Sequence, residues 1–360
     1  MISFGFITVR EAQELSYVTE IAKRSSHHGI TVYRFTPHSI DPSTENVHGY
    51  KYNDSSLQWE KAIFRIPDYL YDRCFYGSDD ASKKAQPIMN WLKNNPNTTF
   101  LGHGLPNKWN IYQALKKDSE LAFYLPHTEE ATSSTNILKK LVKEKQILLK
   151  PVSGSMGNGI IGLFINQNKI ETITHHGRNA DKNVFTSKSA IINWLNKLLA
   201  TNSYLYQPLL SLQDQDNRPY DIRILLQKNE DGKWHELGRG IRKGQQGSLI
   251  SNISGGAEII AFNEWIKTFT ANERLLLLEN IHTIVNFLPR ILEMNFQPMF
   301  EIGVDLGMAS DGSVWILDTN SKPGRKVVLK TNPAKNEDIY TAPLLYCKFL
   351  DQLKENVKRS

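Results

Sequence analysis

The chain has 360 residues, of which 40% are hydrophobic and 22% are charged, and these proportions are those of an ordinary globular protein. Its formal net charge of +6 suits anionic ligands, but the lysines and arginines are dispersed, so nucleic-acid binding is not expected. The two cysteines, Cys74 and Cys347, are too few for a disulfide framework and lack the spacing of a metal site.

No targeting or membrane segment is expected from the sequence. The first residues lack a basic region followed by a long apolar run, which argues against a secretory signal. No run of 18 consecutive apolar residues occurs, so no membrane-spanning helix is expected. We therefore expect a cytoplasmic protein without membrane partners.

The first 105 residues alternate between strands and helices. Apolar runs predict strands at residues 2–9, 30–35, 62–67 and 99–101. Apolar residues at helical spacing predict helices at residues 11–26 and 86–94. Residues 39–56 are predicted to be irregular, and residues 69–77 to form an aromatic turn. The strand–helix–strand order at the start is typical of an α/β layer with parallel strands.

The rest of the chain mixes helices and antiparallel strand patterns. Helices are predicted at residues 108–117, 134–145, 187–200 and over most of 263–293. Strands are predicted at residues 146–150, 159–165, 203–207, 220–227 and 234–242. A last helix is expected at residues 338–357, with an interruption at Pro343. We therefore divide the chain at residues 1–105, 106–335 and 336–360.

Residues 300–325 carry the densest set of oxygen-bearing side chains at informative spacing. They read as two strands joined by a turn at Asp311-Gly312, with Asp305 on the first strand. Asp318 and Asn320 end the second strand and share a face, because side chains two apart on a strand point the same way. Folded back beside Asp305, they would offer three oxygen donors to Mg²⁺. The alternative is an acidic turn whose side chains bind only backbone groups.

A glycine-rich loop follows the strand that ends at Lys150. Glycines let the backbone approach phosphate oxygens closely, and Lys150 could place its ammonium group on a phosphate. The loop is not a Walker A motif, because the lysine precedes the glycines. A Gly/Ser hairpin without a ligand is the alternative. The loop residues that could surround a phosphate are Ser153, Gly154, Ser155, Gly157 and Gly159.

Residues 204–210, YLYQPLL, end a strand with an aliphatic stretch. Such a stretch could give an adenine ring an apolar bed and backbone hydrogen-bonding groups. It could equally be part of a hydrophobic core, and nothing in it is specific.

Two arginines are candidates for anion binding. Arg223 lies between Ile222 and Ile224 on an apolar strand, and Arg242 lies in the segment GRGIRKGQQG. The planar guanidinium group suits two-point contacts with phosphate oxygens. Strand alternation also points Arg223 away from the core face, so exposure to solvent is the alternative. A second small-residue loop, SNISGG, lies at residues 251–256.

Taken together, these motifs resemble the ATP-grasp superfamily. The shared order is a lysine before a glycine-rich loop, an aliphatic segment with Gln, D-x-R, SN-x-x-GG, and D-(x12)-D-x-N-S-x-P-G. The last motif is similar to the metal-binding ends of D-alanine–D-alanine ligase and of glutamate ligases that modify ribosomal protein. More narrowly, the chain resembles the YheC/YheD family, described as endospore coat-associated, in the segments FLGHGLPNKWNIYQAL, YLPHT, ILLKPVSGSMGNGI and WILDTNSKPG.

The resemblance implies a role for each matching residue. Residues implied to bind ATP are Lys108, Lys150, the loop Ser153, Gly154, Ser155, Gly157 and Gly159, and, at adenine, Gln207 and Leu209. Arg223 and Arg242 would be catalytic and face the transferred phosphate. Two Mg²⁺ ions would be held by Asp305, Asp318 and Asn320. Asp318 departs from the superfamily, which usually has Glu there with a longer arm for bridging two ions.

The resemblance also implies a fold and a reaction. We expect an ATP-grasp fold of α/β and α+β parts: an α/β domain at residues 1–105, an ATP-grasp domain of two lobes at 106–335, and a C-terminal helix at 336–360 packed on the core. The expected reaction is ADP-forming ligation of an unidentified carboxylate to an amine through an acyl phosphate. The alternatives are a spore-associated ATP-binding or assembly protein with little turnover, which would contact spore coat proteins, and a small-molecule kinase.

Overall fold

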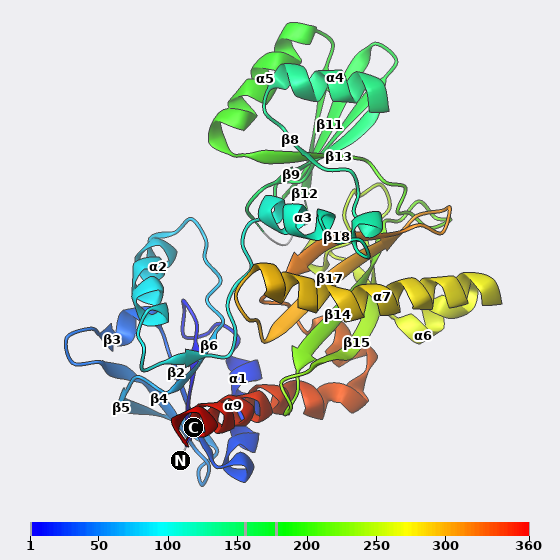
Figure 1. Ribbon diagram of the computed structural model, residues 1–360. Coiled ribbons are helices and arrows are strands. Elements are labelled where there is room, and N and C mark those ends of the chain that lie inside the picture. The colour runs from blue at the N-terminus through cyan, green and yellow to red at the C-terminus, as the bar shows by residue number, and fades with distance from the viewer. Residues whose placement is uncertain (1, 155–156, 177–178, 360) are drawn as a thin grey trace.

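The computed structural model describes residues 2–154, 157–176 and 179–359. These residues form three β-sheets, which follow one another along the molecule in Figure 1. The N-terminal sheet lies at the lower left, the sheet containing β9–β13 lies at the top, and the sheet containing β14–β18 lies between them and to the right. The middle sheet therefore contacts both other parts of the molecule.

The N-terminal sheet has a parallel centre and an antiparallel edge. Its strands are β1 (Ile2–Ile7), β2 (Ile30–Phe35), β3 (Ile40–Asp41), β4 (Asn46–Asn53), β5 (Gln58–Arg65), β6 (Tyr69–Asp72) and β7 (Thr99–Phe100). The order is β3-β4-β2-β1-β6-β7, with β5 paired to β4. β1 pairs in parallel with β2 and β6, as the strand–helix–strand order predicted. The helices are α1 (Leu15–Ser25), which buries Val18, Ile21 and Ala22, and α2 (Asp80–Lys93).

Three predictions for this region were wrong. Residues 39–56 are not irregular, because they include β4, which pairs with β5. This pairing is made by backbone hydrogen bonds, which polar residues can form as well as apolar ones. The aromatic segment begins with strand β6, which pairs with buried β1. Helix α2 begins at Asp80 rather than Gln86, because the Asp79 side chain accepts a hydrogen bond from the Ser82 N–H and caps it, leaving Pro87 inside the helix.

The second sheet is antiparallel and backed by two helices. Its order is β12-β11-β10-β9-β13-β8. The strands are β8 (Glu129–Glu130), β9 (Gln146–Pro151), β10 (Ile161–Asn166), β11 (Lys169–His176), β12 (Asn179–Phe185) and β13 (Tyr204–Pro208). The helices are α4 (Ser134–Glu144) and α5 (Lys188–Thr201). Leu141, Leu149 and Leu195 are fully buried between the helices and the sheet, so this lobe has a hydrophobic core of its own.

The third sheet is covered on both faces. Its order is β16-β15-β14-β17-β18, with strands β14 (Tyr220–Lys228), β15 (Trp234–Lys243), β16 (Glu258–Ala261), β17 (Glu301–Met308) and β18 (Val314–Asn320). Ile222 and Ile224 pack against α3 (Lys108–Lys116) and α7 (Ala271–Asn295), and α6 (Phe262–Trp265) lies nearby. The other face, which carries Leu225, packs against α8 (Lys326–Thr331), α9 (Asn336–Arg359) and the N-terminal region.

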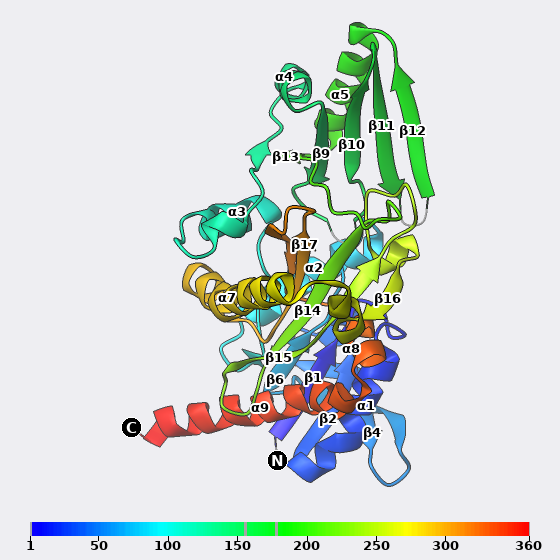
Figure 2. The same cartoon turned by 90° about the vertical axis from the view of Figure 1, so that its right-hand side faces the viewer.

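Helix α9 runs beside α1 in both Figure 1 and Figure 2. It continues through Pro343, so the predicted interruption was wrong. Proline has no N–H to donate to the carbonyl four residues before it, which here is that of Ile339. The Tyr17 hydroxyl of α1 donates to that carbonyl instead, at 3.4 Å. A contact from a distant part of the chain thus replaces the missing helical bond.

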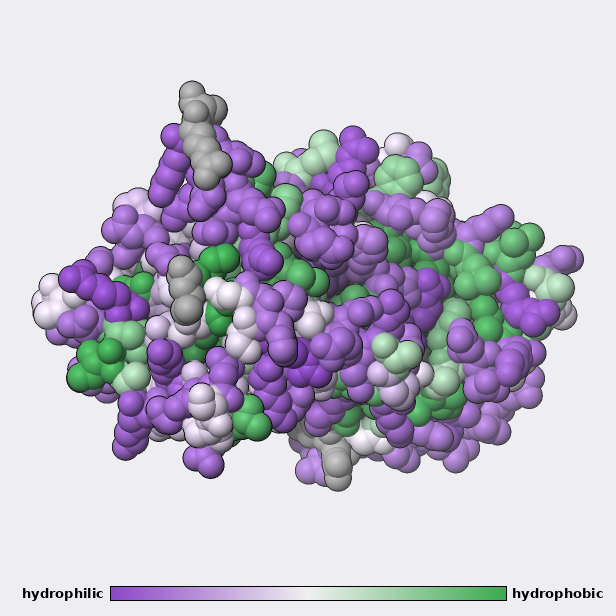
Figure 3. All heavy atoms as spheres, turned by 90° about the horizontal axis from the view of Figure 1, so that it is seen from below, coloured by the Kyte–Doolittle hydropathy of each residue, from purple (hydrophilic) through white to green (hydrophobic). Residues whose placement is uncertain are grey.

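Helix α7 is, among the described helices, long and apolar enough to cross a membrane by length and composition. In this fold its buried side chains, such as Ile281, Ile284 and Leu288, lie in the core beneath the third sheet. Leu275, Leu276 and Leu278 remain exposed near its start. Figure 3, the view from below, shows a largely hydrophilic surface with hydrophobic side chains gathered toward the right-hand end.

Candidate functional site

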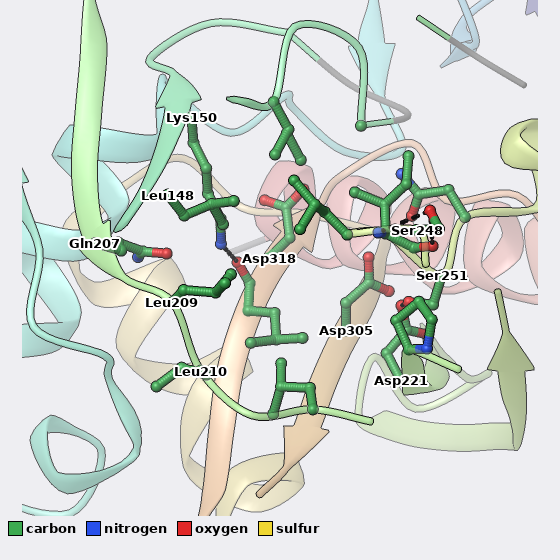
Figure 4. Close-up of a pocket in the computed structure, with 18 of the residues that line it drawn as sticks. Leu148, Lys150, Gln207, Leu209, Leu210, Asp221, Ser248, Ser251, Asp305 and Asp318 are labelled. Carbon is green, nitrogen blue, oxygen red and sulfur yellow. Dashed lines mark hydrogen bonds between the residues drawn. The ribbon is translucent and has the colours of Figure 1, made fainter. Parts of the chain in front are cut away.

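A cavity of about 150 Å³ lies between the second and third sheets (Figure 4). Its walls come from β9 and the glycine loop, from the segment after β13, from the segment 248–252, and from β17 and β18. Of the residues singled out in the sequence, those that line the cavity are Lys108, Lys150, Gly154, Gly157, Gln207, Leu209, Asp305 and Asp318. The fold therefore brings residues up to 210 positions apart, Lys108 and Asp318, into one site.

The remaining candidate residues lie elsewhere. Ser155 is outside the described residues. Ser153 and Gly159 belong to the glycine loop but do not line the cavity, and Asn320 lies beyond Asp318 on β18 without reaching the cavity wall. Arg223 and Arg242 lie behind the wall, where they contact the carboxylates that line it.

Asp305 and Asp318 face the same cavity because their strands pair directly. Asp305 is opposite Asp318 in the β17–β18 ladder, and residues opposite each other in a ladder point to the same face. The register then shifts, so that Leu306 pairs with Ile316 and Leu317 is the extra residue of a bulge. The next same-face pair is Gly303 with Asn320.

A cluster of buried charges stands behind Asp305. Its carboxylate pairs with the Arg223 guanidinium and, at 2.9 Å, with Nη2 of Arg242. Arg242 also binds both carboxylate oxygens of Asp221, at 2.6 and 2.7 Å. Burial alone would raise the pKa of Asp305, but Arg223 and Arg242 outweigh burial and lower it. For Asp221 burial prevails, and its pKa is raised.

The alternative that Arg223 is exposed to solvent does not hold, and Arg242 is buried as well. Arg223 and Arg242 are only 9% and 5% exposed. Strand alternation does place Arg223 opposite to Ile222 and Ile224, but that second face of the sheet is covered as well. Sequence periodicity reports which face a residue occupies and cannot report whether a distant segment covers that face.

Two lysines approach the same carboxylate region. Nζ of Lys108, the first residue of α3, lies 2.6 Å from Oδ1 of Asp318. Nζ of Lys150 lies 3.5 Å from the Leu317 carbonyl oxygen. Burial lowers the pKa of Lys150 to about 8, and the carboxylate of Asp318 opposes this only in part. A partly buried ammonium group whose hydrogen bond goes to a backbone carbonyl would gain from a phosphate beside it.

The glycine loop lies close to the segment 248–252 across the cavity. Gly157 has φ +73, which strains a residue with a side chain, and a Cβ atom there would lie 2.1 Å from Nδ2 of Asn252, so Asn252 would have to move. The Leu249 N–H donates to Nε2 of His175, at 3.2 Å, beside the same loop. Described parts of the two lobes are thus in contact over the cavity.

The segment after β13 supplies apolar side chains to the cavity wall. Tyr204 and Tyr206 are buried in the core of the second lobe. For these two residues the alternative, that the stretch belongs to a hydrophobic core, is correct. Leu209 and Leu210 instead line the cavity, together with Leu148 from β9. These side chains form a surface on which a flat, weakly polar ring could lie.

Asp221 and Ser251 line the cavity; the sequence singled them out as members of the D-x-R and SN-x-x-GG motifs but assigned no role to either side chain. The Ser251 hydroxyl donates to Asp221, which also holds Arg242. A signal was present, because Asp221 is an acidic residue on an otherwise apolar strand, two positions before Arg223. The sequence position of Asp221 does not reveal that its partner is Arg242 on the neighbouring strand.

The three-sheet arrangement, with a cavity between the last two sheets, is the ATP-grasp fold, as expected. The macrocyclase MdnC bound with precursor peptide MdnA from Microcystis aeruginosa MRC aligns with a TM-score of 0.55 and 11% identity, over 96% of this chain and 99% of that chain. D-alanyl-alanine synthetase A from Vibrio cholerae O1 biovar eltor str. N16961 aligns with a TM-score of 0.52 and 12% identity, over 96% of this chain and 98% of that chain.

The chain belongs to the YheC/D-like ATP-grasp family, whose sequence pattern matches residues 97–350. Its similarity to endospore coat-associated protein YheC of Bacillus subtilis (strain 168) is 39% identity over 350 residues, covering 97% of this chain and 96% of that protein. The expectation of this family from the sequence motifs is therefore confirmed.

Proposed function

We propose that this protein is an ATP-dependent, ADP-forming ligase that joins a carboxylate to an amine through an acyl phosphate. One observation carries the proposal. The lining of a single cavity combines apolar side chains, among them Leu148 and Leu209, with charged ones, among them Lys150 and Asp318. That combination suits a nucleotide, whose base needs apolar contacts and whose phosphates need charged partners. In this proposal residues 1–105 form an α/β domain, 106–335 the ATP-grasp domain and 336–360 a helix on the core.

The oxygen donors in the cavity fit Mg²⁺ held together with phosphates. Two carboxylates, Asp305 and Asp318, face the cavity from paired strands, and hard oxygen ligands are those that Mg²⁺ prefers. Among the described residues, no group of three or more His, Cys, Asp and Glu side chains could hold a metal, so phosphate oxygens and water would complete the shell. We propose that Asn320 adds its amide oxygen and that two ions bind.

The chain's own residues would serve phosphoryl transfer by position and charge. Bound Mg²⁺ would neutralise phosphate charge during transfer. Lys150, which is partly buried and lines the cavity, would bind a phosphate oxygen, and Lys108 would do so once it leaves Asp318. Arg223 and Arg242, which lie behind the wall on Asp305 and Asp221, would stabilise the transferred group once they leave those carboxylates, as its negative charge redistributes. The glycine loop and the segment 248–252 would exclude water.

The bond changes follow from this arrangement. A substrate carboxylate oxygen bonds to the γ-phosphorus as the bond to the ADP oxygen breaks, which leaves an acyl phosphate. The amine nitrogen then bonds to the acyl carbon, phosphate departs, and the amine loses a proton. We propose an amino acid, peptide or protein as substrate, because the similar fold of MdnC is described bound with a precursor peptide.

A second candidate is an ATP-binding or assembly protein of the spore with little turnover. Two observations favour it. Asp318 has a shorter arm than the Glu usual at this position, and its carboxylate is engaged by Lys108. The name of the relative YheC also describes it as endospore coat-associated. Under either candidate we propose a cytoplasmic origin with spore coat proteins as partners. A small-molecule kinase is the third candidate.

The deciding experiment measures the products of ATP. Purified protein is incubated with ATP, Mg²⁺ and pooled amino acids and peptides, and products are identified by mass. The ligase predicts ADP, phosphate and an amide, with ATP cleaved slowly or not at all until the carboxylate is present. AMP and pyrophosphate would reject the acyl-phosphate route. ATP binding without any product favours the binding protein, and a stable phosphorylated product favours the kinase.

A further inference from the structure

Gln207 forms part of the wall between two cavities. It lines the main cavity and also a smaller one of about 50 Å³ beside α3. Thr128 lines only the smaller cavity, on the far side of that wall. The Gln207 side chain is only 8% exposed, and Thr128 only 3%. The amide of Gln207 therefore has one end toward each cavity.

A chain of hydrogen bonds determines which end faces which cavity. The Thr128 hydroxyl donates its proton to the Pro126 carbonyl oxygen at 2.8 Å. Because a hydroxyl has one proton, Thr128 can then only accept from Gln207, whose Nε2 lies 2.7 Å from Oγ1. Pro126 is buried. If the Thr128 hydroxyl instead donated its proton to Gln207, the buried Pro126 carbonyl oxygen would lose this hydrogen-bond donor. The amide nitrogen thus faces Thr128, and the oxygen faces the main cavity (Figure 4).

The backbone around Thr128 holds this arrangement in place. The Thr128 N–H donates to the Tyr112 hydroxyl at 3.2 Å. The next residues form β8, in which Glu129 pairs with Tyr206, the neighbour of Gln207. Thr128 directly precedes β8, and Gln207 lies on β13, so the pairing of these two strands holds the two residues close together.

We infer that Gln207 and Thr128 select the base of the nucleotide. This inference rests on the proposed function, in which the base lies against the apolar side chains of the cavity. The fixed Oε1 of Gln207 accepts a hydrogen bond from a base amino group, as at position 6 of adenine. If the base has an oxygen at position 6, that oxygen and Oε1 of Gln207 are both acceptors and cannot hydrogen-bond to each other. Both atoms then lose their hydrogen bonds to water without a replacement, which weakens binding.

Thr128 acts through Gln207 and does not touch the nucleotide, so it is a positioning residue. A glutamine amide without this partner could rotate by half a turn and donate its N–H group to a base oxygen. Selection therefore depends on the hydroxyl of Thr128 as much as on Gln207 itself. Removing only that hydroxyl should relax selectivity while the shape of the wall is kept.

The experiment compares binding of ATP and ITP, which differ in having an amino group or an oxygen at position 6 of the base. Titration calorimetry with Mg²⁺ gives both affinities for the wild type, Thr128→Val and Thr128→Ser. We expect the wild type to prefer ATP by about tenfold or more. Thr128→Val should bind ITP more tightly and lose most of that preference, and Thr128→Ser should keep it. Gln207→Met, without an acceptor, should lose the preference through weaker ATP binding.

The outcomes separate this inference from the function on which it rests. Equal affinity of the wild type for ATP and ITP, or an unchanged ratio in Thr128→Val, would overturn base selection while ATP binding still stands. Failure of the wild type to bind either nucleotide would overturn both. If Thr128→Val is unfolded by circular dichroism, the ratios for Thr128→Ser and Gln207→Met decide, and equal ratios for these two variants would refute the inference.

Discussion

Replacing Arg73 tests how the N-terminal region is attached to the candidate site. Arg73 is fully buried and binds Glu14 at 2.7 and 2.9 Å, the carboxylate of Glu301 on β17, and the Pro323 carbonyl oxygen at 3.1 Å. Pro323 lies in the loop directly after β18, the strand that carries Asp318. Arg73→Met keeps most of the apolar stem and removes the charge and all of these bonds.

The expected cost follows from what remains after the change. Breaking a buried ion pair by removing one partner typically costs about 3–5 kcal/mol, because the other charge stays buried without compensation. Here Arg325 still lies 3.3 Å from Glu301, and Gln227 lies 3.0 Å from it. These partners offset part of the loss, so we expect a decrease of about 3 kcal/mol in the free energy of unfolding.

The assay is urea denaturation at pH 7, followed by circular dichroism. The matched control is Arg10→Met, which breaks an ion pair with Asp79 whose side chains are 58% and 40% exposed. Exposed pairs contribute little, so the control should lose less than about 1 kcal/mol. A loss in Arg73→Met no larger than that in the control would refute the reasoning from burial.

The pH dependence provides a second readout of the same cluster. Burial alone would raise the pKa of Glu14, but Arg73 and Arg325 outweigh burial and lower it. A carboxylate with a lowered pKa in the folded state stabilises the fold above its unfolded pKa, and this is lost as the pH falls through the folded pKa. Without Arg73 the folded pKa rises, so the loss should begin at a higher pH than in the wild type. Coinciding acid profiles would contradict this.

The other predictions concern the cavity itself. Lys150→Ala should weaken ATP binding about 10- to 150-fold in titration calorimetry, because one charge-assisted phosphate contact is lost, and unchanged affinity would exclude Lys150 from the phosphate site. Asp318→Asn should abolish ATP turnover and leave the melting temperature nearly unchanged, and wild-type turnover would rule out its metal role. Arg242→Lys keeps a charge beside Asp221 but not the two-point contact, so turnover should fall about 100-fold and ATP affinity less than tenfold. Equal losses would make Arg242 an anchor for the nucleotide only.

Local patterns in the sequence were enough for the elements around the cavity. The Asp311-Gly312 turn signal and the alternation around it predicted the hairpin that brings Asp305 opposite Asp318. The lysine and glycines at residues 150–159 likewise predicted a strand followed by a loop, and both reach the cavity. These features depend on backbone preferences within a few residues, and such preferences can be read directly from residue types.

Contacts between distant segments decided the rest. Arg223 is buried on the second face of its strand, where it and Pro323 of the loop after β18 both lie against Gly303. The Ile339 carbonyl, which Pro343 leaves without a helical donor, accepts a hydrogen bond from Tyr17. The direction of the Gln207 amide depends on the proton of Thr128, 79 residues earlier. In each case the environment of a side chain is supplied by a segment far away in the sequence. Periodicity assigns a residue to a face, and only the tertiary structure determines what lies against that face.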